Sequence, residues 1–161
     1  SALSCVRPNF ASTFNNLDEA PETYWVGYGH LHKTGRVVEI TPPNFPTDLG
    51  VNDPAAINFP KPKIYDAEYH GGFLDGNTLV LNRTYKVKVE ATCLGPWCGN
   101  FPAEDTPMLL MMQQGPEGMT LKMGPCPGPV QQGPTKAQIE AIQACLRFGT
   151  CRPSEQQAFE F

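Results

Sequence analysis

The sequence predicts a small, closed, all-β barrel with a C-terminal α-helix packed on it and disulfide bonds pinning its loops. The length of 161 residues allows one domain with a sizeable core but not two domains and a linker. Only 17% of the residues are charged, whereas 17 are Pro and 15 are Gly, which favours short strands joined by ordered loops. Apolar and polar residues alternate in several segments, and a helical period is convincing only near the end.

A long strand is predicted to open the barrel. Residues 23–33 alternate with a period of two, which places His30 and His32 together on one face. Thr34-Gly35 is a turn signal, so we expect residues 36–41 to return as an antiparallel partner of the first strand.

Residues 42–64 are predicted to form an excursion over the surface. The segment is rich in proline, which supplies no hydrogen-bond donor to a β-ladder. Residues 152–161 are expected to form a tail. Because the sequence contains no internal repeat and no second set of core-forming elements, we treat residues 1–161 as a single domain.

Two strands are expected after the excursion. Residues 64–69 have strand character, and residues 78–93 carry the cleanest alternation in the chain. Apolar residues such as Val87 alternate there with charged residues such as Lys88, which predicts one face in the core and one in water. Residues 94–106 are rich in Gly and Pro and are expected to form a loop.

A β-hairpin and a helix complete the predicted fold. Residues 108–113 and 119–123 are apolar and flank a short Gly- and Pro-containing connection, which indicates a hairpin. The helix is expected to begin after Thr135, with Gln138 at the capping-box position, and to stop at Gly149. Its apolar stripe consists of Ile139, Ile142 and Leu146.

The charge balance argues against nucleic acid as a partner. The chain carries 12 Lys and Arg against 16 Asp and Glu, a net charge of −4, which leaves no basic surplus to neutralise phosphates. No apolar run is long enough for a transmembrane helix. The sequence contains no nucleophile elbow, zinc-protease motif or phosphate-binding loop, and its nearest carboxylate cluster, Asp66, Glu68 and Asp75, is typical of a solvated face. We therefore do not expect an enzyme.

The cysteine count predicts an oxidising compartment. Six cysteines in a chain of this length indicate three disulfides and a secreted or periplasmic protein. We expect Cys145 to pair with Cys151, which would link the end of the helix to the segment that follows it. For the other four, two pairings stay open: Cys5–Cys126 with Cys93–Cys98, which we favour, or Cys5–Cys98 with Cys93–Cys126. The spacing of Cys93 and Cys98 also roughly fits a zinc–thiolate site, a third interpretation.

The histidines suggest an alternative function, the binding of a metal ion. His30 and His32 project from the same face of a strand and can jointly bind a metal ion if that face is open. Further candidate ligands are His70 and the methionines Met108, Met111, Met112, Met119 and Met123. Imidazole and thioether ligands suit copper in an oxidising compartment, with zinc as the other candidate. Against this hypothesis, methionines commonly fill irregular space in a core, and the histidines can simply be solvated. Without a metal site, we expect no cofactor.

The second half of the chain resembles a known family. The resemblance is carried by Cys98-Gly99-Asn100-Phe101, an apolar strand over 108–112, a hairpin containing Gly118, a strand running into Cys126, a helix from Thr135, and Gly149-Thr150-Cys151. In the first half, Cys5 precedes an apolar strand containing Tyr24-Trp25-Val26-Gly27. This order is similar to the inhibitory domain of the tissue inhibitors of metalloproteinases, a netrin-like domain. The resemblance implies an OB-fold-type, five-stranded Greek-key barrel whose N-terminal segment is pinned by disulfides.

The resemblance also implies a function. It suggests an extracytoplasmic binding module for a protein partner, with inhibition of a protease as the specific form. The animal inhibitors chelate the protease zinc with an N-terminal Cys-x-Cys, whereas here Val6 and Arg7 follow Cys5. The sparse cysteine pattern resembles that of bacterial, single-domain members more closely. The expected binding surface is one end of the barrel, made of Cys5, Val6, Arg7, Trp97, Asn100 and Phe101, with Phe45 and Phe59 as further aromatic candidates.

Overall fold

A computed structural model of the protein describes residues 9–17, 23–40, 60–126 and 128–160. Its elements in chain order are α1 (Phe10–Asn16), β1 (Thr23–Glu39), β2 (Lys63–Leu74), β3 (Leu79–Ala91), β4 (Cys93–Leu94), β5 (Trp97–Cys98), β6 (Met108–Gly115), β7 (Gly118–Met123), β8 (Val130–Gln132), α3 (Lys136–Phe148) and α4 (Pro153–Gln157). The expected surface excursion, 42–64, lies outside the described residues except for 60–64, where β2 begins at Lys63.

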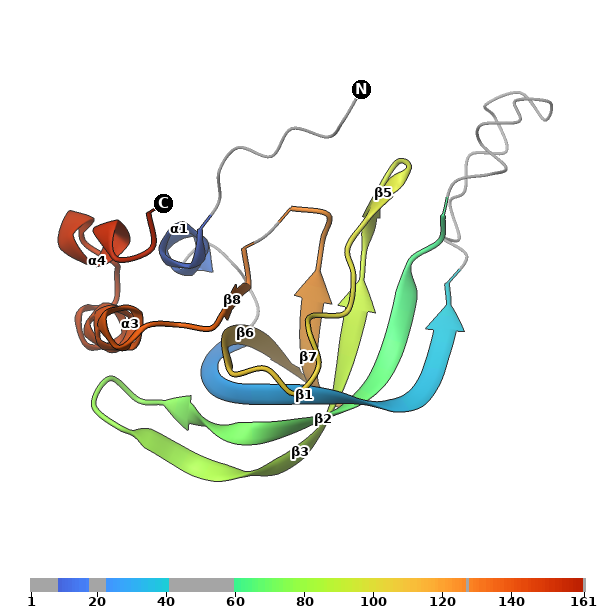
Figure 1. The fold of residues 1–161 in the computed structure, drawn as a ribbon, viewed down its shortest axis with the longest axis horizontal. Helices are drawn as coiled ribbons and strands as arrows, with labels where there is room; N and C mark the ends of the chain where they lie inside the picture. The colour runs from blue at the N-terminus through green and yellow to red at the C-terminus, as the bar shows by residue number, and fades with distance from the viewer. Residues whose placement is uncertain (1–8, 18–22, 41–59, 127, 161) are drawn as a thin grey trace.

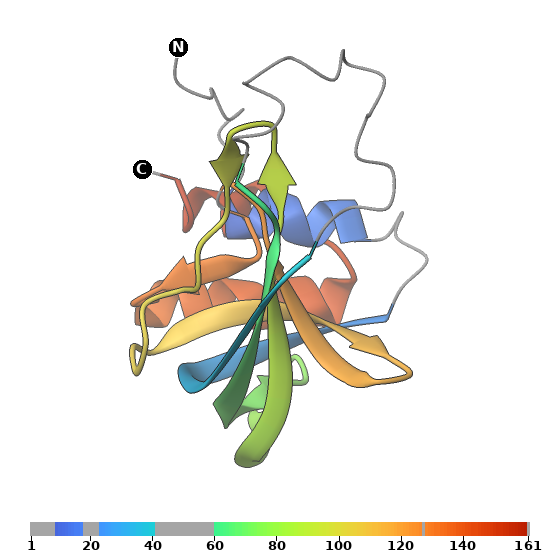
Figure 2. The same ribbon diagram turned by 90° about the vertical axis from the view of Figure 1, so that its right-hand side faces the viewer.

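The strands form the predicted OB-type Greek-key barrel. Their order is β1-β2-β3-β7-β6, and β6 also pairs with β1, which closes the ring (Figures 1 and 2). The β3–β7 pair is parallel, and the other pairs are antiparallel. The short strand β8, which the sequence did not indicate, extends the sheet beside β6. Closure leaves few free strand edges, which limits unwanted pairing with other chains.

The first strand is longer than expected, and the predicted hairpin at Thr34-Gly35 is wrong. Strand β1 runs on to Glu39 and pairs with β2 on both sides of this point. A register shift lies between Lys33 and Val37, and Gly35 has a positive φ of 104°. The glycine therefore supports a β-bulge that bends one continuous strand rather than a turn that reverses it. This bend lets β1 pair with β6 at one end and with β2 along its length.

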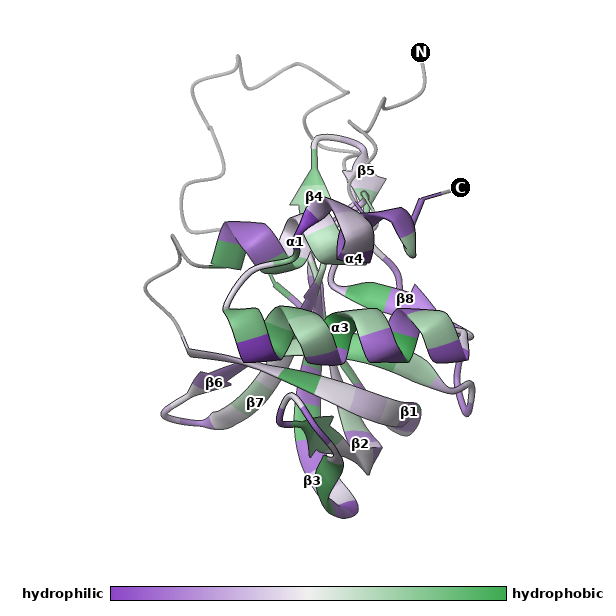
Figure 3. Ribbon diagram, turned by 90° about the vertical axis from the view of Figure 1, so that its left-hand side faces the viewer, coloured by the Kyte–Doolittle hydropathy of each residue, from purple (hydrophilic) through white to green (hydrophobic). Residues whose placement is uncertain are grey.

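In the part of the chain that the structure describes, the buried residues form two clusters on opposite faces of the sheet. Strand β6 belongs to both, because its side chains alternate: Leu110 and Met112 point into the barrel, and Leu109 and Met111 point toward the helices. The barrel cluster also contains Tyr69, Val89 and Leu121, among others. The second cluster contains Phe10, Ile142 and Phe159, among others, and joins the sheet to the helices. The helices gather on one side of the barrel in Figures 1 and 3.

The predicted C-terminal helix is confirmed, together with its caps. In α3, the Thr135 side chain accepts from the Gln138 backbone and the Gln138 side chain accepts from the Thr135 backbone. Gly149 ends the helix in the left-handed conformation, with φ of 78°. The buried Gln143 accepts a hydrogen bond from the Gly76 backbone at 2.7 Å, so α3 also holds the turn between β2 and β3.

Two short helices among the described residues are not indicated by the sequence. Helix α1 begins after Asn9, whose side chain accepts a hydrogen bond from the Ser12 backbone N–H at 2.8 Å. The Ser12 hydroxyl in turn accepts one from the Asn9 backbone N–H at 3.0 Å. Helix α4 lies in residues 152–161, where we expected a tail, and it begins at Pro153, a residue suited to the first helical turn. Phe10 and Phe159 join the two segments through rings 5.8 Å apart. Packing against the barrel stabilises helices that would be too short to persist alone.

The disulfides agree with the favoured pairing where the structure describes them. Cys93 bonds to Cys98 and Cys145 bonds to Cys151. The alternative, in which Cys93 pairs with Cys126, is therefore wrong, and a zinc–thiolate site at Cys93 and Cys98 is excluded because both sulfurs are in the disulfide. Cys126 is also disulfide-bonded, whereas its expected partner Cys5 lies outside the described residues.

Candidate functional site

A small hairpin, β4–β5, projects from the end of the barrel where β3 finishes (Figures 1 and 2). It overlaps the start of the loop expected over 94–106. Leu94 and Trp97 are paired across it, and the disulfide Cys93–Cys98 closes its base with the two Cα atoms 4.0 Å apart. The side chains at its tip are open to solvent: Leu94 is 60% exposed and Trp97 is 37% exposed. Two apolar side chains are thus displayed on a covalently closed hairpin.

The base of the hairpin is anchored to the barrel. The Gly99 backbone N–H donates to the Thr92 carbonyl at 2.9 Å, and the Thr92 N–H donates to the carbonyl of Met123 at the end of β7, also at 2.9 Å. A Cβ at Gly99 would lie 1.9 Å from the Met123 carbonyl oxygen, so no other residue fits there without moving the backbone. These contacts hold the hairpin in a defined direction.

The other expected contact residues divide between half-buried, exposed and undescribed positions. Phe101 is half-buried and packs edge-on against Tyr65, with ring centroids 5.4 Å apart. The Lys33 ammonium lies over both rings. Asn100 is exposed beside the hairpin. Cys5, Val6, Arg7, Phe45 and Phe59 lie outside the described residues.

The three histidines do not share one site. His30 and His70 face each other across β1 and β2 with stacked rings 5.0 Å apart. The Nδ1 of His70 is 3.0 Å from the Thr84 hydroxyl, and its Nε2 is 3.3 Å from a Glu68 carboxylate oxygen. Both ring nitrogens of His70 thus have protein partners. His32 lies further along β1 and contacts a different segment.

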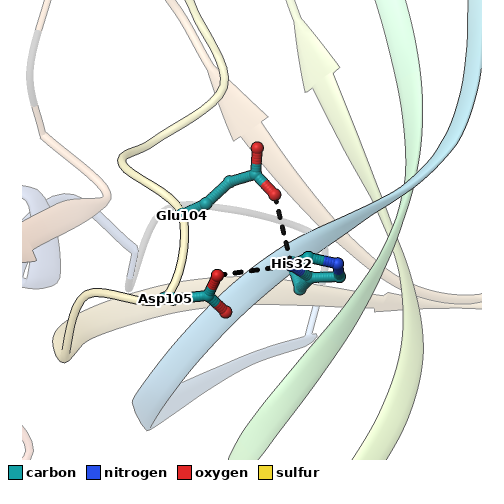
Figure 4. Close-up of side chains that lie close together, drawn as sticks. All are labelled: His32, Glu104 and Asp105. Atoms are coloured by element: carbon teal, nitrogen blue, oxygen red, sulfur yellow. Dashed lines mark hydrogen bonds and ion pairs between the residues drawn. The ribbon is translucent and has the colours of Figure 1, made fainter.

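His32 forms a cluster with two carboxylates that the sequence did not indicate (Figure 4). Its Nδ1 lies 3.3 Å from a Glu104 oxygen and 3.4 Å from an Asp105 oxygen. One ligand atom from each residue lies within 4.8 Å of the others, and no other such group of three occurs among the described residues. An imidazole with two carboxylates is a ligand set that zinc accepts.

Backbone hydrogen bonds bring this cluster together. The Asp105 N–H donates to the Leu31 carbonyl at 2.9 Å, and the Lys33 N–H donates to a Glu104 carboxylate oxygen at 3.1 Å. The segment before β6 therefore runs along the edge of β1. Asp105 has a positive φ of 57°, which an aspartate tolerates better than most residues. The cluster is accessible, since His32 is 51% exposed and Asp105 is 61% exposed.

The methionines do not join the histidines. Met108, Met111 and Met112 are buried in the two apolar clusters, and Met119 and Met123 pack against the barrel cluster. Their thioethers fill core space, in accordance with the competing interpretation of these residues. A copper site of histidine and methionine ligands is therefore not assembled among the described residues.

The carboxylates noted in the sequence have structural partners. Asp66 lies 3.3 Å from the Lys88 ammonium on the neighbouring strand. The Asp75 side chain accepts from the backbone N–H groups of Asn77 and Thr78, each at 2.8 Å, and these bonds lower the pKa of Asp75. Asp75 thereby stabilises the turn between β2 and β3.

Comparison with known proteins identified no relative: no family model, no curated protein and no solved structure matches the chain. Among the described helices, none is both long and apolar enough to cross a membrane.

Proposed function

We propose that the protein is a binding module that contacts a protein partner through the β4–β5 hairpin. The observation that carries the proposal is the exposed Leu94–Trp97 pair on a hairpin closed by a disulfide. Large apolar side chains at the centre of a contact supply most of the binding energy in many interfaces, and tryptophan is prominent among them. Because the hairpin is already ordered, binding costs little conformational entropy.

The compartment proposed for this module is secreted or periplasmic. The two described disulfides are compatible with an oxidising compartment. Nucleic acid remains an unfavourable partner in the proposal, because the net charge is −4.

The resemblance to the metalloproteinase inhibitors supplies a more specific form of the proposal. In that form the partner is a protease, and the segment Cys5-Val6-Arg7 would meet it together with the hairpin. An inhibition assay against a panel of secreted metalloproteases tests it, using the full chain and a chain that begins at Cys5. If neither form inhibits any enzyme of the panel, the inhibitor hypothesis is withdrawn, while binding through the hairpin is tested separately.

The test of hairpin binding compares three immobilised forms of the protein. One is the unmodified chain, the second carries Leu94→Ser with Trp97→Ala, and the third carries Val37→Ser with Val38→Ser. Val37 and Val38 are 47% and 43% exposed on β1, so the third form controls for nonspecific binding through exposed apolar side chains. The expected partner binds the first and third forms and not the second, and titration of the purified partner reproduces that order. Equal binding to all three forms contradicts the proposal.

A second candidate function is binding of a divalent cation by His32, Glu104 and Asp105. The specific observation in its favour is the convergence of one nitrogen and two carboxylate oxygens within 4.8 Å. Zinc fits this set better than copper, because the thioethers lie elsewhere in the core. Lys33 lies 3.9 Å from a Glu104 oxygen and competes for that carboxylate.

Native mass spectrometry during zinc and copper titration tests the metal site. We expect one zinc ion per chain at micromolar concentration, lost in His32→Gln. His30→Gln is the matched control, because His30 stacks on His70 outside the cluster. Absence of uptake, or equal loss in both variants, contradicts the assignment.

A further inference from the structure

A pocket opens at the barrel end where β3 begins, away from the hairpin that follows the end of β3. Its volume is about 290 Å³, and its walls are mainly apolar. The side chains that line it include Trp25, Phe73, Leu81, Arg83, Tyr85 and Met119. Barrel mouths are common positions for small-ligand sites. Neither proposed function uses this pocket.

The walls of the pocket are held in place by contacts among themselves. The Tyr85 hydroxyl donates to the Leu81 carbonyl at 2.5 Å, and the Tyr85 ring packs edge-on against Phe73 with centroids 5.2 Å apart. Trp25 packs edge-on against the same phenylalanine at 5.6 Å. The Arg83 guanidinium lies over the Tyr85 ring, 4.9 Å from its centroid. The aromatic wall is therefore arranged before any ligand arrives, which reduces the entropy cost of binding.

Leu81 occupies an unusual position at this mouth. Its φ is +54°, a conformation that disfavours residues with a branched or bulky side chain. It lies at an irregularity of the β2–β3 pair, where the register shifts between Gly71 and Phe73. The side chain is 56% exposed, so core packing does little to offset the strained backbone. Backbone strain of this kind is found more often at ligand-binding sites than elsewhere in proteins.

From these observations we propose that the pocket binds a small apolar carboxylate. Among the described residues that line the pocket, Arg83 alone is charged. The ligand's apolar group lies among Trp25, Phe73 and Leu81, and its carboxylate meets the Arg83 guanidinium at the mouth. A volume of about 290 Å³ lies at the lower end of the range for small-molecule sites, so the ligand is small.

Phenylacetate and its neutral analogue phenylacetamide are the probes for this site. The chain has two tryptophans, so Trp97→Phe leaves Trp25 as the sole tryptophan reporter. In that background we expect a saturable change in Trp25 fluorescence with phenylacetate at millimolar concentration or below. Phenylacetamide should bind roughly tenfold more weakly, because it lacks the charge-assisted contact. Arg83→Gln should remove the difference between the two probes, whereas Lys86→Gln, on the same strand but outside the pocket lining, should preserve it.

Leu81→Asn separates binding from folding. Asparagine tolerates a positive φ, so the bulge and the melting temperature should be retained while the apolar rim is lost and phenylacetate binds several-fold more weakly. The proposal is overturned by the absence of a saturable signal, by equal affinity for the two probes, or by unchanged affinity in Leu81→Asn. It is also overturned if the Trp25 signal depends on protein concentration and sedimentation shows a dimer, because a second copy would then fill the mouth.

Discussion

Gly29 on β1 and Gly71 on β2 are direct partners in the antiparallel pair, and neither position has room for a side chain. A Cβ at Gly29 would lie 2.3 Å from the His70 carbonyl oxygen, and one at Gly71 would lie 2.5 Å from the Tyr28 carbonyl oxygen. The side chain of Tyr69 lies beside both positions. The close approach of the two strands therefore depends on this glycine pair. The tight curvature of the barrel wall depends on the same pair.

Gly71→Ala should destabilise the fold. The added methyl group meets backbone atoms that cannot move independently, so we expect a loss of about 1–3 kcal/mol in the free energy of unfolding, the usual range for overpacking. Chemical denaturation measures it. Gly115→Ala is the matched control, because the nearest atom to its Cβ would be 3.7 Å away. Equal losses in the two variants would show that the close approach is not the cause.

Tyr69→Phe should weaken the barrel core. The Tyr69 hydroxyl is buried and donates to the Gly72 carbonyl at 2.6 Å, so its removal leaves that acceptor without this partner. We expect a loss of about 1–3 kcal/mol, measured by urea unfolding. Tyr85→Phe is a useful comparison, since the Tyr85 hydroxyl bonds to a carbonyl at the exposed mouth. If Tyr69→Phe costs no more than Tyr85→Phe, burial of the hydroxyl contributes nothing extra.

The same tyrosine predicts alkaline sensitivity. Burial raises the pKa of Tyr69 well above its ordinary value of 10.0. The folded state therefore holds a proton that the unfolded state releases above pH 10, so the stability contribution is complete below that pH and declines as the pH rises further. Unfolding free energies at increasing alkaline pH should fall more steeply in the unmodified protein than in Tyr69→Phe. Parallel curves would contradict this origin of the sensitivity.

The parts of the fold that could be read from the sequence are those set by local contacts. The capping box of Thr135 and Gln138 and the stop at Gly149 specify α3 within a few residues of chain. The β6–β7 hairpin is equally local, because one short turn joins its strands. Alternation also identified β3, since one face of that strand is buried in the barrel.

Features that the sequence did not indicate come from contacts between distant segments. Thr34-Gly35 has the composition of a turn, yet β2 pairs with β1 on both sides of it and keeps the strand continuous. Strand spacing places His32 on the same face as His30 but gives no sign of Glu104 and Asp105, which approach His32 from a segment about 70 residues away in the sequence. No periodicity in a single sequence reports such an approach.

Glu155 should make the C-terminal region sensitive to acid. A hydrogen bond from the Arg152 guanidinium at 2.7 Å, with a further one from Ser154, lowers the pKa of Glu155 from 4.5 to about 2. A lowered pKa in the folded state means that the stabilisation is present above pH 4.5 and is lost as the pH falls toward 2. The free energy of unfolding should therefore decline over this interval, and less so in Glu155→Gln. Glu160→Gln, on an exposed residue nearby, should leave the decline unchanged.

The two described disulfides should differ in what they stabilise. Cys145 and Cys151 are buried at 0% and 2% exposure within the helix-facing cluster, whereas Cys93 and Cys98 belong to neither cluster and close only the projecting hairpin. Closing so short a loop is worth about 2 kcal/mol in the chain-entropy model. Replacing Cys93 and Cys98 by Ser should therefore leave the barrel folded, with the same near-ultraviolet circular dichroism from the core tyrosines, while the hairpin loses its order and partner binding falls.

Replacing Cys145 and Cys151 by Ser adds the burial of two hydroxyls and should lower the melting temperature of the whole domain. If the hairpin pair lowers the melting temperature as much as the buried pair, the hairpin is part of the cooperative core, and its role as a separate contact element would have to be abandoned.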